Sequence, residues 1–182
     1  DGLRTTAGSR ILEDFITPYD SHVWSTLKQK GSLLGGKLAM DEFAMGSFTN
    51  TSAFGKVSIP GFPDRSAGGS SGGSGAAMAG DLFDFTVGSD TGGSVRLPAS
   101  FCSVVGYKPS YGAFSRYGMI SYASSLDQAG FFTKDLEDLS YLLESGVSEK
   151  DKRDTTSIGL GSYSVVDKKS YSVAYFPEIL EK

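Results

Sequence analysis

Two glycine turns decide how this sequence is interpreted: residues 68–75 read GGSSGGSG, and residues 88–96 read GSDTGGSVR. Between them, residues 76–87 read AAMAGDLFDFTV, which predicts a short helix over 76–79 and a buried strand over 82–87. Glycine lets the backbone adopt positive φ angles and approach a ligand closely, and consecutive N–H groups at a helix start can bind a developing anion. The serines of the turns would then supply the chemistry.

A flexible linker is the alternative for residues 68–75, because their composition taken alone is that of a linker. Two features of the surrounding sequence favour a site. The loop is bracketed by apolar sequence typical of regular structure, and a second Gly-Gly-Ser turn follows closely, for which a linker gives no reason. We therefore expect the two turns to form one site.

Composition limits the possible classes of protein. With 182 residues, 39% of them hydrophobic, the chain is long enough for one globular domain with a core. Its net charge of −4 offers no electrostatic surface for nucleic acid or an anionic membrane, so any contact with RNA would come through a partner. The single cysteine, Cys102, excludes an internal disulfide and a multi-cysteine metal site, which fits a reducing compartment. No apolar run approaches the length of a membrane span.

Apolar spacing and capping residues predict three further helices. They cover residues 20–30, with Val23, Trp24 and Leu27 on one face, residues 94–101, and the amphipathic stretch 135–145, which Gly146 would stop. Strands are predicted over 32–39, 104–109 and, near the end of the chain, 171–176. Irregular structure is expected over 40–67, surface or site loops over 110–130, and a solvated charged connection over 150–154. This alternation favours the α/β class.

The chemistry open to the serines is limited by the scarcity of histidine. A Ser-His-Asp triad would depend on His22, the only histidine, which lies far upstream in a predicted helix and precedes the serines in the wrong order for a nucleophile elbow. Neither turn has the Gly-Lys-Ser/Thr or G-x-G-x-x-G pattern of a phosphate-binding loop. The single Cys and the single His are far apart in the sequence, so a zinc site is not expected. Serine chemistry without histidine normally uses a lysine as the ultimate base.

A specific resemblance supports serine chemistry. Residues 68–74 and 88–99 resemble the signature of the amidase signature family, including two serines 24 residues apart, Ser70 and Ser94. Residues 40–47, 111–118 and 124–128 are similar to the branch formed by the A subunits of glutamyl-tRNA(Gln) amidotransferases. The resemblance covers nearly the whole chain. It implies α/β/α layers around a mixed central sheet, with residues 1–182 as the central part of a single domain whose N- and C-terminal parts lie outside this sequence.

The resemblance also implies roles for individual residues. Ser94 would be the acylated nucleophile, and Ser70, on a cis peptide after Gly69, would relay protons between Ser94 and a lysine. The backbone amides of Thr91, Gly92, Gly93 and Ser94 would form an oxyanion hole. Structural support of the site would come from Asp90, Arg96 and Ser71. Substrate binding would involve Met45 and Gly46, although a purely structural role for their loop is the alternative.

The sequence departs from the family pattern in two respects. The family's lysine lies in a Lys-Asp-Asn motif that would precede Asp1, and Lys37 is a poor replacement because the surrounding GKLAM resembles a segment in which the lysine is not the base. We therefore expect the nucleophile without the complete catalyst. The connection over residues 60–67 is also short for the A-subunit branch.

The implied function is that of a glutamine-hydrolysing amidase subunit that supplies ammonia for converting Glu-tRNA(Gln) to Gln-tRNA(Gln). Its partners would be a B subunit, which binds tRNA and uses ATP and Mg²⁺, and a small accessory subunit; no cofactor or metal is expected in this chain. The alternatives are a stand-alone amidase acting on a small amide and a non-catalytic structural subunit. The Ser/Lys-rich, Ala-poor composition favours the mitochondrial matrix, with the bacterial cytoplasm as the alternative.

Overall fold

The structure is a computed structural model that describes residues 2–145, 147–160, 170 and 172. The predicted helix stop at Gly146 lies outside the described residues, as does most of the strand predicted over residues 171–176. No helix among the described residues is long and apolar enough to cross a membrane.

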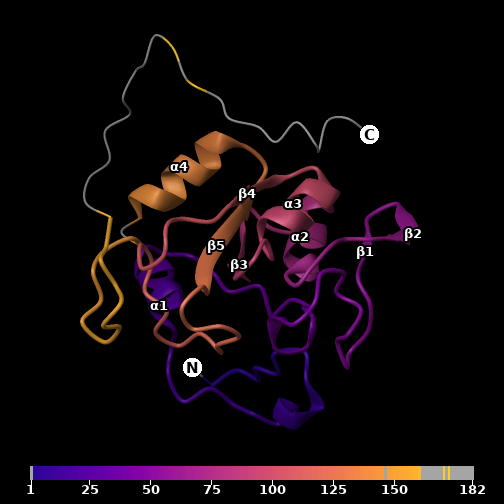
Figure 1. Cartoon of the computed structure of the whole chain (residues 1–182), viewed down its shortest axis with the longest axis horizontal. Helices are drawn as coiled ribbons and strands as arrows, with labels where there is room; N and C mark the ends of the chain where they lie inside the picture. The colour runs from indigo at the N-terminus through magenta and orange to yellow at the C-terminus, as the bar shows by residue number, and fades with distance from the viewer. Residues whose placement is uncertain (1, 146, 161–169, 171, 173–182) are drawn as a thin grey trace.

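A three-stranded sheet forms the centre of the described fold, with strand order β3-β5-β4 (Figure 1). Its strands are β3 (Thr86–Asp90), β5 (Gln128–Thr133) and β4 (Val105–Tyr107). Both pairings are antiparallel, and all six residues of the middle strand β5 are buried. The parallel pairings of the expected mixed sheet are therefore not found among the described residues.

Helices cover both faces of this sheet. Consecutive side chains of β5 point to opposite faces, so its neighbouring apolar residues pack against different helices. Phe131 packs into a cluster with residues of α1 (His22–Gln29) and α4 (Leu136–Glu144). Phe132, the next residue, packs with Met78 of α2 (Gly72–Ala79) and Ala99 of α3 (Arg96–Cys102). The result is the predicted α/β/α layering.

The helices on the two faces differ in side-chain size. α2 is made of glycine, serine, alanine and one methionine, so the chain comes very close to it: a Cβ on Gly73 would lie 2.4 Å from the carbonyl oxygen of Ala39. α1 and α4 use larger apolar residues and begin at capped ends, where the side chains of Ser21 and Asp135 accept hydrogen bonds from Trp24 N and Asp138 N. α1, α3, α4 and β4 thus confirm their predictions.

Smaller elements lie on the N-terminal side. The 3₁₀ turns η1 (Arg10–Leu12) and η2 (Glu42–Ala44) interrupt irregular chain, and an antiparallel hairpin of β1 (Ser58–Ile59) and β2 (Phe62–Ser66) projects from the edge of the molecule (Figure 1).

One predicted element is absent, three boundaries are wrong, and residues 40–67, expected to be irregular, contain η2, β1 and β2. Residues 32–39 form no strand. The strand predicted over 82–87 begins only at Thr86, and Leu82 is 68% exposed. Helix α2 begins at Gly72, four residues before its predicted start. Residues 110–130, expected to be loops, contain the start of β5 at Gln128. Residues 32–39 and Leu82 are largely exposed despite their apolar sequence, whereas the start of α2 is buried by contacts with residues distant in sequence.

Candidate active site

The first glycine turn carries a buried serine whose hydroxyl is hydrogen-bonded to none of the residues that the structure describes. The peptide between Gly69 and Ser70 is cis, as the resemblance implied. Ser70 is fully buried, and its Oγ has no hydrogen-bond partner within the described part of the chain. Its carbonyl oxygen accepts a hydrogen bond from Asp41 N at 3.0 Å. An unsatisfied buried hydroxyl costs about 1–3 kcal/mol, so such groups in native proteins often have a functional role.

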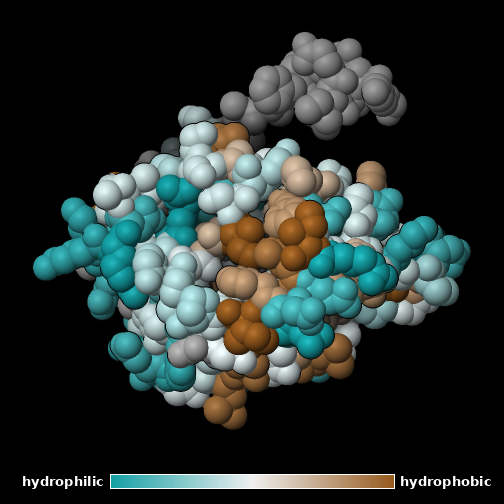
Figure 2. Space-filling view, turned by 90° about the horizontal axis from the view of Figure 1, so that it is seen from below, coloured by the Kyte–Doolittle hydropathy of each residue, from teal (hydrophilic) through white to brown (hydrophobic). Residues whose placement is uncertain are grey.

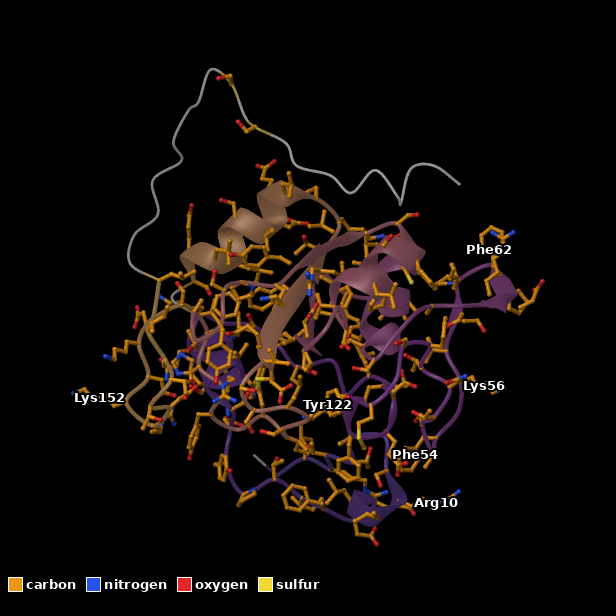
Figure 3. All side chains as sticks on the ribbon, viewed as in Figure 1. Arg10, Phe54, Lys56, Phe62, Tyr122 and Lys152 are labelled. Atoms are coloured by element: carbon orange, nitrogen blue, oxygen red, sulfur yellow. The ribbon has the colours of Figure 1, made fainter. Side chains whose placement is uncertain are left out.

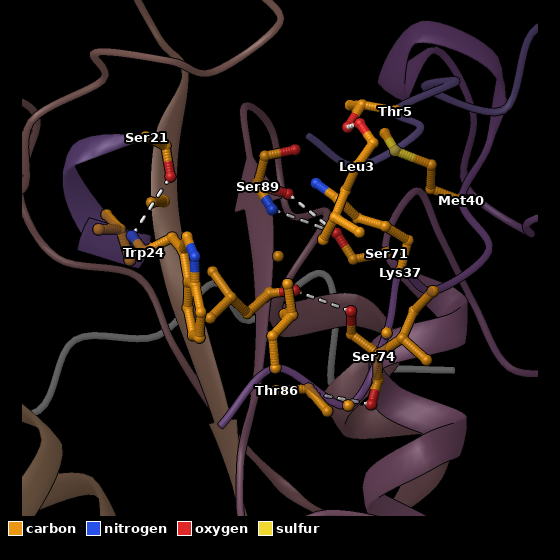
Figure 4. A pocket seen from close by; sticks show the side chains of 18 of the residues that line it. Leu3, Thr5, Ser21, Trp24, Lys37, Met40, Ser71, Ser74, Thr86 and Ser89 are labelled. Atoms are coloured by element: carbon orange, nitrogen blue, oxygen red, sulfur yellow. Dashed lines mark hydrogen bonds between the residues drawn. The ribbon is translucent and has the colours of Figure 1, made fainter. Parts of the chain in front are cut away.

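The residues after Ser70 form the start of α2 rather than a linker. Gly72 to Gly75 are buried in the helix, so the linker interpretation is wrong. Ser71 Oγ donates to Ser89 O (3.2 Å) and accepts from Ser89 N (3.3 Å), and Ser74 Oγ donates to Val87 O (2.9 Å; Figure 4). Two serines of the loop thereby satisfy backbone groups of β3, which is the supporting role expected of Ser71.

The second turn is held by a buried carboxylate that is paired with a half-exposed guanidinium. Asp90 is fully buried and accepts hydrogen bonds from the N–H groups of Gly93 (2.8 Å), Val95 (3.1 Å) and Arg96 (3.3 Å). The Arg96 guanidinium also donates to both carboxylate oxygens, at 3.0 and 2.9 Å. Burial alone would raise the pKa of Asp90, but the bonds from Arg96, Val95 and Gly93 outweigh it and lower that pKa. Asp90 and Arg96 therefore support the turn, as expected.

The expected oxyanion hole needs one correction. Gly93 N–H is engaged by Asp90 Oδ1, so this group is not a free donor. No acceptor among the described residues is hydrogen-bonded to the N–H groups of Thr91, Gly92 or Ser94. Gly93 has a φ of +129°, a conformation that favours glycine, and no atom lies within 4 Å of a Cβ built on Gly92 or Gly93. The turn thus presents open backbone on one side.

The two turns meet directly through their backbones. Ser71 N donates to Ser94 O at 3.2 Å, although the residues are 23 positions apart. This bond brings the chain at the cis peptide beside the half-buried Ser94. The structure therefore brings the two glycine turns side by side, while the joint role of Ser70 and Ser94 stays a prediction.

The other expected binding residues lie on a supporting loop. Met45 is 52% exposed, while a Cβ on Gly46 would lie 2.3 Å from the Asp41 carboxylate carbon. Asp41, which sequence reasoning missed, is fully buried and accepts from the N–H groups of Thr49 (2.8 Å), Asn50 (2.9 Å) and Thr51 (3.1 Å). These contacts favour the structural alternative for Gly46.

A large cavity of about 1150 Å³ lies beside the site. Ser71, Ser74 and Ser89 line it together with Lys37 (Figure 4), whereas Ser70 and Ser94 do not. Lys37 keeps contact with solvent, yet desolvation by the surrounding protein lowers its pKa. Apolar side chains gather around a hollow on the face shown in Figure 2.

His22 belongs to a separate network. Its Nδ1 lies 3.2 Å from Asp151 Oδ2, and Asp151 also accepts from Ser115 Oγ (2.9 Å) and the Arg153 guanidinium. Burial raises the pKa of Asp151, but the Arg153 bonds outweigh it and lower that pKa to about 2. No serine of the two turns takes part, so His22 forms no Ser-His triad with them.

The predicted solvated connection over residues 150–154 is only partly correct. Lys152 extends outward from this loop (Figure 3), but Asp151 is 6% exposed and points into the network around His22. Among the described residues, no group of three or more His, Cys, Asp or Glu side chains could hold a metal ion.

Comparison with known proteins agrees with this geometry. Residues 1–178 match the Amidase family. The chain belongs to the amidase family. It is 50% identical over 187 aligned residues to the A subunit of glutamyl-tRNA(Gln) amidotransferase from Sulfolobus acidocaldarius, covering 99% of this chain and 39% of that protein. The A subunit from Thermus thermophilus is 54% identical over 159 residues, covering 87% of this chain and 34% of that protein.

Solved structures show the same fold. The crystal structure of the glutamyl-tRNA(Gln) amidotransferase A subunit from Thermotoga maritima has a TM-score of 0.85 and 49% identity, covering 88% of this chain and 35% of that one. Kluyveromyces lactis allophanate hydrolase has a TM-score of 0.83 and 31% identity, covering 87% of this chain and 26% of that one. This amidase chain thus spans little more than a third of the length of its curated relatives.

Proposed function

We propose that this amidase-family chain carries the nucleophile of a glutamine-hydrolysing subunit, which supplies ammonia for converting Glu-tRNA(Gln) to Gln-tRNA(Gln). The observation that carries the chemical part of the proposal is the Ser71 N–Ser94 O hydrogen bond, which joins the cis-peptide loop to the serine turn. The substrate rests on the relatives, since the A subunits from Sulfolobus and Thermus are 50% and 54% identical to the chain.

In the proposed mechanism, Ser94 Oγ attacks the side-chain amide carbon of glutamine. The developing oxyanion accepts hydrogen bonds from the free N–H groups of Thr91, Gly92 and Ser94. Ser70 takes the proton of Ser94 and passes it to a basic group. The resemblance assigns that group to a lysine preceding Asp1.

The C–N bond then breaks, and the relayed proton returns to the leaving nitrogen, so that ammonia departs and an ester with Ser94 remains. Water, deprotonated through the same relay, hydrolyses this ester to glutamate. The buried hydroxyl of Ser70 makes no hydrogen bond to any described group, Ser94 included, so the relay requires the two hydroxyls to approach each other when substrate binds.

The proposed partners follow from the same function. A protein that releases ammonia for another reaction must deliver it, so we expect a complex with a B subunit, which binds tRNA together with ATP and Mg²⁺, and with a small accessory subunit. The net charge of −4 supports the assignment of tRNA binding to the partner subunit, because an acidic chain attracts phosphate groups poorly. For the compartment, the archaeal and bacterial relatives named above favour the bacterial cytoplasm over the mitochondrial matrix.

A stand-alone amidase acting on a small amide is the second candidate. It is supported by the structural similarity to 6-aminohexanoate cyclic dimer hydrolase, with a TM-score of 0.83 at 31% identity. The higher identity to the amidotransferase relatives favours glutamine. A non-catalytic structural role, the third alternative, gives no reason for the unbonded Ser70 hydroxyl.

Mass spectrometry of the full-length protein tests the proposal. After incubation with a glutamine-like electrophile, we expect a covalent adduct on Ser94, and ammonia release from glutamine should exceed that from small aliphatic amides. An adduct on Ser70 or Cys102 with Ser94 unmodified would contradict the mechanism. Faster turnover of a small amide, with the adduct still on Ser94, would favour the stand-alone amidase instead.

A further inference from the structure

A second buried carboxylate, Asp127, is hydrogen-bonded to the serine turn. Asp127 is 3% exposed, and its Oδ1 accepts a hydrogen bond from Thr91 Oγ1 at 2.5 Å, across 36 positions of sequence. Its Oδ2 accepts from the N–H groups of Tyr122 (2.8 Å) and Ala123 (3.0 Å). Asp127 therefore ties the turn to the loop of residues 121–127.

This contact continues the sheet beyond its last backbone pair. Asp90 is paired with Gln128 at the end of the β3–β5 ladder, so Thr91 and Asp127 are the next residues on the two strands. Gln128 is fully buried and fixed on both sides of its amide, accepting from Gly112 N (2.8 Å) and donating to Phe114 O (2.9 Å). Asp127 thus extends from a rigid point of the core.

The turn itself has little to hold it on its open side. No atom lies within 4 Å of the Cβ positions of Gly92 and Gly93, and glycine loses more conformational freedom on ordering than any other residue. Asp90 fixes the end from Gly93 to Arg96, while the side chain of Thr91 bonds only to Asp127 among the residues that the structure describes. The Asp127 bond is therefore the side-chain restraint on the Thr91 end of the turn within the described structure.

We infer that Asp127 is a positioning residue for the oxyanion-binding N–H groups, acting through the hydroxyl of Thr91. The inference rests on the proposed amidase function. Donors stabilise an oxyanion efficiently only when their orientation is fixed before the reaction. Because a displacement of about 1 Å can cost on the order of 10²-fold in rate, loss of the Thr91–Asp127 bond should affect turnover as well as folding.

The test compares matched threonine substitutions in the full-length protein, with its partner subunits where these copurify. Thr91→Val removes the hydroxyl and keeps the shape, and Thr91→Ser keeps the hydroxyl. Thr133→Val is the control: Thr133 is fully buried at the other end of β5, where its hydroxyl donates to Asp135 O at 2.7 Å. The measurements are kcat and KM for ammonia release from glutamine and the free energy of unfolding.

For Thr91→Val we expect kcat to fall roughly 10- to 100-fold with little change in KM, because the lost interaction acts mainly in the transition state. Thr91→Ser should retain most of the activity. Thr133→Val should lower the free energy of unfolding without changing kcat. If Thr91→Val does not fold, Asp127→Asn should show the same fall in kcat, since its amide nitrogen cannot accept the bonds that the carboxylate oxygen accepts.

The outcomes separate the two proposals. An active wild type whose kcat is unchanged in Thr91→Val, or falls equally in Thr133→Val, overturns the positioning role alone. A folded wild type that releases no ammonia from any amide and forms no Ser94 adduct overturns the proposed function and, with it, the role of Asp127.

Discussion

The bonds to Asp90 predict how the serine turn responds when each half of its ion pair is removed. In Asp90→Ala, the N–H groups of Gly93, Val95 and Arg96 lose their acceptor, and the guanidinium loses both of its carboxylate bonds. A buried donor left without its acceptor costs about 1–3 kcal/mol. The side chain of Arg96 is 53% exposed, so water compensates for its lost bonds, and we expect a cost of about 3 kcal/mol that comes mainly from the backbone N–H groups.

Arg96→Met should cost less. It removes the two guanidinium bonds but leaves the three backbone N–H groups on the buried Asp90 carboxylate. We expect a loss of about 1.5 kcal/mol, the lower limit for hydrogen bonds to a charged group. The order of the two variants is therefore the prediction: the turn depends more on the backbone bonds to Asp90 than on the guanidinium.

Urea unfolding of the full-length protein measures both free energies, and the rate of ammonia release reports the geometry of the turn. As a control, Asp135→Ala removes the exposed cap of α4, which should cost about 1 kcal/mol without changing turnover. The reasoning would be refuted if Arg96→Met destabilised the protein as much as Asp90→Ala. Full activity in Asp90→Ala would likewise show that the turn does not need its carboxylate.

Three further predictions concern the relay and the second network. Ser94→Ala should abolish the acyl intermediate, and Ser70→Ala should slow its formation and hydrolysis. The double variant should be little slower than Ser94→Ala, because the losses of rate from residues that act as a unit are not additive. Rapid-quench kinetics would show additive losses if the two serines act separately. His22→Gln should leave kcat unchanged, since His22 lies in the Asp151 network; a loss of about 10³-fold in the folded variant would indicate a histidine base. The pKa of Asp151 in the folded protein, about 2, lies below its usual value of 3.8. Its contribution to the free energy of unfolding is therefore fully present above pH 3.8 and is lost as the pH falls toward 2. Acid unfolding of Asp151→Asn should lack this part of the loss of stability.

The sequence alone determined the features that depend on local patterns. The caps at Ser21 and Asp135 and the apolar spacing that follows each of them were enough to predict α1 and α4. The two glycine turns and their serines were sufficient to predict one site. Local hydrogen bonds and periodic burial are properties of short segments, so they can be inferred from the residues in them.

Only the tertiary structure decided which residues hold the site together. Gly72 to Gly75 have the composition of a linker, yet they begin a buried helix in which Ala39 packs against Gly73 and Pro98 against Gly75 too closely for an added Cβ to fit without displacement. Asp127 lies in a segment predicted to form surface or site loops and Asp151 in one predicted to be solvated, yet each is buried and has a hydrogen-bond partner 36 positions away along the chain. A buried carboxylate is stable only where such donors meet it, and no local pattern specifies which distant donors will do so.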